Sequence, residues 1–141
     1  MSLPSASIII AVDPGRSKSG VAVVSGPNPI KILEHFVVES TALVEELQDI
    51  LQRLPDVSCL VMGNGTGSAV LVSTVRDSLP LLDLKLVDEH GTSEQARARF
   101  VAEESFPLLQ RLLPRGLRTP TRPYDDYVAI ILAEQYFGRN R

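Results

Sequence analysis

The strongest constraint in this sequence is an apolar, mostly β-branched run near the start of the chain that ends abruptly in Asp-Pro-Gly. Residues 7–12 read Ser-Ile-Ile-Ile-Ala-Val, and Asp13, Pro14 and Gly15 follow them. A run this apolar is typical of a strand buried on both faces of a sheet, and the Pro-Gly pair ends it in a turn. The chain therefore predicts a buried β-strand with a carboxylate placed directly after its end.

The rest of the chain alternates between strand and helix patterns. Further strands are expected at 20–24, 30–38, 57–62 and 84–87. Helices are expected at 43–54, 69–79, 93–102 and 125–137, with a short one at 107–113. Ser40 or Thr41 is expected to cap the first of these helices. The order βββαβαβα predicts a single α/β domain over residues 1–141, in which helices cover both faces of a five-stranded mixed sheet.

Composition excludes several classes of protein. Cys59 is the only cysteine and lies far from both histidines, so no standard zinc spacing exists. No apolar run approaches the roughly 18 residues of a membrane span, and no basic segment precedes the first apolar stretch, so we expect a cytoplasmic protein. The net charge of −3 argues against a general nucleic-acid coat, although residues 105–124 contain four arginines and no acid.

Acidic residues recur where an α/β sheet usually binds its ligands. Asp13 and Glu89 lie just past the ends of two predicted strands, and Asp125 and Asp126 open the last helix. Ligands gather outside the carboxyl ends of parallel strands, so these residues are consistent with one site. Each also has an ordinary structural explanation, because Asp is common in turns and acids stabilise a helix N-terminus.

Three segments resemble the motifs of the YqgF/RuvC-like family of the RNase H-like superfamily. They are 12–23 (VDPGRSKSGVAV), 88–93 (DEHGTS) and 125–129 (DDYVA), in the family's order. The resemblance implies an RNase H-like fold and a nuclease that uses Mg²⁺ or Mn²⁺ to cleave either pre-16S rRNA at its 5′ end or Holliday junction-type DNA. It makes Asp13, Glu89 and one of Asp125 and Asp126 the catalytic metal ligands.

The chemistry of those residues agrees with the implied cofactor. Mg²⁺ binds carboxylates together with waters and substrate phosphates, and two such ions can stabilise an in-line displacement at phosphorus. A gapless match to the family's last motif selects Asp125 as the ligand, whereas the resolvase pattern of Asp, two residues and Ala selects Asp126. Adjacent helical positions point about 100° apart, so usually only one of the two can face the site.

One loop departs from the family pattern. Gly63-Asn64-Gly65-Thr66 stands where the family has Gly, an apolar residue and Pro, and it resembles the YqgF-like domain of the transcription factor Tex, in which the nuclease carboxylates are not kept. A second hypothesis is therefore a non-catalytic module that binds nucleic acid or protein. For the nuclease, RNA or branched DNA is the expected partner. Whether the chain forms a homodimer is left open by the sequence. Contacts to nucleic acid are expected from Arg16, Lys18, Asn64, Thr66, Arg115, Arg118 and Arg122.

Overall fold

The computed structural model describes residues 6–65, 68–88, 95–96, 98–99, 102 and 125–139. The strands are β1 (Ser7–Asp13), β2 (Lys18–Gly26), β3 (Lys31–Glu39), β4 (Val57–Gly63) and β5 (Leu84–Val87). The helices are the 3₁₀ helix η1 (Ser40–Ala42), α1 (Leu43–Arg53), α2 (Ala69–Ser78) and α5 (Asp125–Arg139). Within the described part of the chain, no helix is long and apolar enough to cross a membrane.

Most of the predicted elements are confirmed, with ends that differ by no more than two residues. Only five residues of the helix predicted at 93–102 are described, and the segment 107–113 lies outside the described residues. The prediction that Ser40 or Thr41 caps the first long helix is wrong. The N-cap of α1 is Ala42, without a side-chain cap, because the Ser40 hydroxyl donates instead to the carbonyl oxygen of Gly15 at 2.6 Å.

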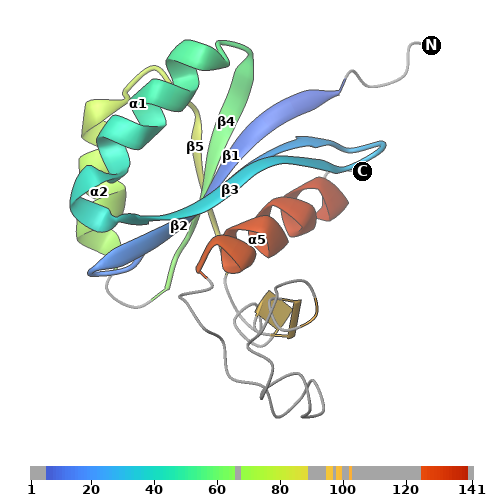
Figure 1. Ribbon diagram of the computed structural model, residues 1–141. Helices are drawn as coiled ribbons and strands as arrows, with labels where there is room; N and C mark the ends of the chain where they lie inside the picture. Colours follow the sequence, from blue (N-terminus) through green and yellow to red (C-terminus); the bar gives the residue numbers. More distant parts are fainter. Residues whose placement is uncertain are drawn as a thin grey trace.

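The five strands form one mixed sheet in the order β3-β2-β1-β4-β5. β1, β2 and β3 are an antiparallel meander, whereas β4 runs parallel to β1 and β5 runs parallel to β4 (Figure 1). β1 is the central strand, which explains why its apolar run is continuous. β3 lies at an edge, as its polar interruptions predict, and its residues are partly or well exposed along its whole length.

Alternate residues of the central strand pack on opposite faces of the sheet. Ile9 and Ala11 belong to the core beneath α5, and Ile10 and Val12 belong to the core beneath α1 and α2. Figure 1 shows α1 and α2 together on one side of the sheet and α5 on the other. The sheet therefore separates two hydrophobic cores, as the predicted helices on both faces require.

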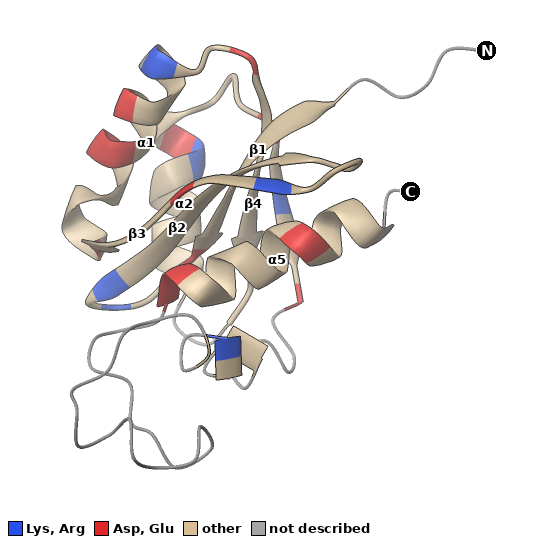
Figure 2. Cartoon of the chain, turned by 45° about the vertical axis from the view of Figure 1, so that its right-hand side comes forward, with Lys and Arg blue, Asp and Glu red and all other residues tan. Residues whose placement is uncertain are grey.

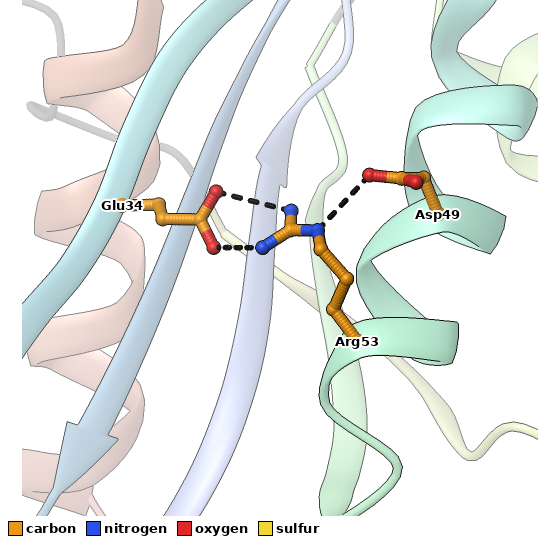
Figure 3. Close-up of polar contacts among 3 residues, drawn as sticks. All are labelled: Glu34, Asp49 and Arg53. Carbon is orange, nitrogen blue, oxygen red and sulfur yellow. Dashed lines mark hydrogen bonds and ion pairs between the residues drawn. The ribbon is translucent and has the colours of Figure 1, made fainter.

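Charged residues also connect α1 to the edge strand. Arg53 donates two hydrogen bonds to the carboxylate of Glu34, at 2.8 and 3.1 Å, and one to Asp49 at 3.0 Å (Figure 3). These hydrogen bonds, to Glu34 first and Asp49 second, raise the pKa of Arg53 further above its usual value. The guanidinium is solvent-exposed, so the network adds little to stability compared with the two cores.

Candidate active site

The turn after β1 is fixed by a ring of hydrogen bonds. The amide of Gly15 donates to the Ser19 hydroxyl at 3.3 Å, and the Ser40 hydroxyl, 2.8 Å from that of Ser19, donates to the Gly15 carbonyl. Ser19 is fully buried and Ser40 nearly so. Because buried hydroxyls with fixed partners rigidify the backbone around them, this ring holds the segment that carries Asp13 at the end of β1.

Gly20 brings the start of α5 onto the sheet. Gly20 is the β2 partner of Asp13 in the antiparallel register. A Cβ atom at position 20 would overlap with the backbone of Asp125 and Asp126. Only glycine allows so close an approach of two backbones, so this residue determines where the first turn of α5 meets the end of β1.

This packing joins Asp13 and Asp125, which come from opposite ends of the sequence, through a side-chain hydrogen bond. Figure 2 shows the acidic first turn of α5 beside the strands. Burial raises the pKa of Asp125 above its usual value, and although the hydrogen bond with Asp13 lowers it, the charge of Asp126 raises it again. The first turn of α5 thus turns Asp125, the first of the two candidate acids, toward Asp13.

Asp126 points elsewhere, to His35 on the edge strand. Its Oδ2 lies 2.8 Å from Nδ1 of His35, and its side chain is 1% exposed. The imidazole also makes an edge-to-face contact with the ring of Tyr127 at a centroid distance of 5.3 Å. His35 could not be identified from the sequence, because a single polar residue in an edge strand carries no signal of its distant partner.

The other predicted site residues are only partly brought together. Glu89, Thr66, Arg115, Arg118 and Arg122 lie outside the described residues. Lys18, at the start of β2, forms an ion pair with Glu39 at 2.8 Å. Arg16 is exposed in the turn after β1, and Asn64 is exposed directly after β4. Among the described residues, no group of three His, Cys, Asp or Glu side chains is close enough to hold a metal ion.

The Asp13–Asp125 pair nevertheless has the chemistry of a site for a divalent cation. Both side chains offer the hard oxygen donors that Mg²⁺ and Mn²⁺ prefer. Burial raises the pKa of Asp125 and so disfavours its charged form in the absence of a cation. The donor set therefore fits the cofactor that the sequence predicts, with two ligands from the described residues.

Comparisons with known proteins identify the fold. No protein-family model and no curated protein matches the chain. Among solved structures, the Fowlpox virus Holliday junction resolvase is 15% identical, with a TM-score of 0.64 over 95% of this chain and 99% of that one. Its complex with substrate Holliday junction DNA is 14% identical, with a TM-score of 0.62 over 94% and 98% of the two chains. Thermus thermophilus RuvC bound to a Holliday junction is 16% identical, with a TM-score of 0.54 over 94% and 95%.

The chain has the RNase H-like fold. The five-stranded mixed sheet and the helices on its two faces, predicted from the sequence, are confirmed. At these identities the likeness to RuvC and to the poxvirus resolvase concerns the RNase H-like fold alone. The closer resemblance of the sequence motifs to YqgF, and of the 63–66 loop to Tex, stays a prediction.

Proposed function

We propose that this RNase H-like protein is a nuclease for branched DNA that uses Mg²⁺ or Mn²⁺ held by Asp13 and Asp125. The observation that carries the proposal is the hydrogen bond between these two carboxyls at the carboxyl end of the central strand. Branched DNA is favoured because solved structures of the same fold include resolvases bound to Holliday junctions. Glu89 stays the predicted third ligand on the strength of its sequence motif.

Each part of the described site has a role in this proposal. A bound divalent cation would polarise the phosphodiester and lower the pKa of the attacking water. Asp13 and Asp125 would hold the cation, and the Ser19–Ser40 hydrogen bonds would keep Asp13 in place. His35 and Asp126 would act as positioning residues, because their hydrogen bond fixes the first turn of α5 and so the direction of Asp125.

The test is cleavage of a labelled four-way DNA junction by the purified protein in Mn²⁺, with a linear duplex and a structured RNA as comparison substrates. Asp13→Asn and Asp125→Asn should each reduce the rate more than about a hundredfold, since even groups that only support metal ligands cost 10–100-fold. Asp56→Asn is the matched control. It makes the same chemical change at an exposed position just before β4, at the opposite end of the parallel strands.

The outcomes separate the candidate functions. Cleavage of the RNA rather than the junction would favour the maturation of pre-16S rRNA that the YqgF resemblance implies. Salt-dependent binding of nucleic acid without cleavage, unaffected by EDTA or by Asp13→Asn, would replace the nuclease with a non-catalytic binding module. If the two Asp variants cleave as fast as the Asp56 control, the proposed metal site is wrong.

A further inference from the structure

The residue that precedes α2, its N-cap, lacks the usual capping contact. Ser68 is the N-cap of α2, but its hydroxyl makes no capping hydrogen bond, although serine at this position normally accepts one from the helix backbone. The residue is only 6% exposed, and no partner for its hydroxyl occurs in the part of the chain that the structure describes. Buried hydroxyls are almost always hydrogen-bonded, so an unpartnered one at a helix N-terminus indicates a site for a ligand.

Ser68 lines a cavity of about 330 Å³ beside α2. The cavity is lined by Asn64 and Ser68 at one end, by Arg76 two turns further along α2, and by Leu86 of β5. Among the residues that the structure describes, Arg76 forms no ion pair and no carboxylate lines the cavity. No acid lies in the first turn of α2. The amides of the first helical turn have no partners within a helix, so the cavity combines a hydroxyl, a helix N-terminus and a guanidinium.

The cavity lies at the same end of the sheet as the candidate active site. Val12 of β1 is paired with Met62 of β4, so Asp13, the last residue of β1, and Asn64, which follows β4, lie at the carboxyl ends of neighbouring parallel strands. The amide of Asn64 donates to the carbonyl oxygen of Val87 at 3.0 Å, which fixes the start of this loop to β5. The cavity lies beside α2 and the carboxylate pair beside α5, on opposite faces of the sheet, so a nucleic-acid strand that passes around this end of the sheet would meet both sites.

We propose that the cavity binds a backbone phosphate of the nucleic-acid strand whose scissile phosphate lies at Asp13 and Asp125. Amides at a helix N-terminus, hydroxyls and arginines are the groups that proteins use for phosphate. A phosphate fixed here sets the position of the strand relative to the carboxylates without reading its sequence. The inference rests on the proposed nuclease for the identity of the ligand, but binding at the cavity requires neither metal nor cleavage.

The test compares the binding of a labelled four-way DNA junction by variants in EDTA, followed by fluorescence anisotropy over a series of NaCl concentrations. Ser68→Asp keeps a good N-cap residue but places a carboxylate where the phosphate would lie. It should raise Kd by at least about tenfold at low salt and flatten the slope of log K against log salt by about 0.9 per lost phosphate contact. Arg76→Gln, on the exposed side of α2, should flatten the slope in the same way.

Gln52→Glu is the matched control, because it adds the same single negative charge on an exposed part of α1 near the amino ends of the parallel strands. It should change Kd by less than about twofold, since screening weakens a charge at that distance. Thermal unfolding should show that Ser68→Asp is at least as stable as the wild type.

The inference is overturned if Ser68→Asp and Arg76→Gln both bind like the Gln52 control, or if the wild type binds neither the junction nor structured RNA. If only the proposed nuclease activity is wrong, the result of these experiments is different. The wild type would then bind in a manner sensitive to Ser68→Asp, yet it would cleave nothing in Mn²⁺.

Discussion

Substitution of Gly20 by alanine tests how α5 lies on the sheet. The added methyl group would overlap with the backbone of Asp125 and Asp126, and a backbone cannot rotate away as a flexible side chain can. Overpacking costs about 1–3 kcal/mol, and we expect about 3 kcal/mol because the whole start of α5 must move. An unfolding entropy of about 2.1 cal/mol/K per residue gives about 0.3 kcal/mol/K for 141 residues. The Tm of Gly20→Ala should therefore fall by about 10 °C.

The assay is thermal unfolding followed by circular dichroism, with the unfolding free energy measured in urea. Gly138→Ala is the control, because it makes the same change in α5, the helix that Gly20 contacts, and none of the described atoms lies within 4 Å of the added Cβ. Alanine is favoured over glycine inside helices by about 1 kcal/mol, so this variant should be as stable as the wild type or more so. If Gly20→Ala has the wild-type Tm, the first turn of α5 does not lie against β2, and the Asp13–Asp125 contact that depends on this packing is wrong as well.

Three further predictions concern side chains around the site and the edge strand. Burial raises the pKa of Asp125 in the folded protein, so the stability that its protonated carboxyl gives at low pH is lost as the pH rises through that pKa. The stability of Asp125→Asn relative to the wild type in EDTA should therefore grow as the pH rises above about 4. His35→Phe keeps a ring against Tyr127 but leaves buried Asp126 without this partner, and urea unfolding should show a loss of about 1–3 kcal/mol; a change below about 0.5 kcal/mol would contradict the role of this hydrogen bond. Arg53→Gln should lower the Tm at low salt, and the difference should disappear in about 1 M NaCl.

The sheet could be predicted from the sequence because its signals are local. The continuous apolar run at 7–12 marks a strand buried on both faces, and the polar interruptions at 30–38 mark an edge strand. The order of elements then leaves few topologies, since successive elements usually lie side by side in space. The cap of α1 was predicted wrongly because Ser40 belongs to a ring of hydrogen bonds with Gly15, which is distant in sequence.

The choice between Asp125 and Asp126 could not be made from the sequence, for a physical reason. The seven residues from 127 to 133 are all buried, so the apolar pattern of α5 has no single stripe that shows which side faces the sheet. The rotation of the helix is set instead by the close approach at Gly20 and by the hydrogen bond from Asp126 to His35. Both contacts join segments about a hundred residues apart, and neither leaves a periodic signal.

The sign of one stability change distinguishes a functional Asp125 from a merely structural one. An acid that only stabilises a helix N-terminus lowers stability when it is replaced by asparagine. Asp125 is instead held half-buried against Asp13, with its pKa raised, so the same replacement should raise the stability of the metal-free protein. Mn²⁺ should stabilise the wild type, because it binds only the folded state, and should stabilise Asp125→Asn much less. A buried acid that costs stability until a cation binds is expected where function, rather than folding, maintains it.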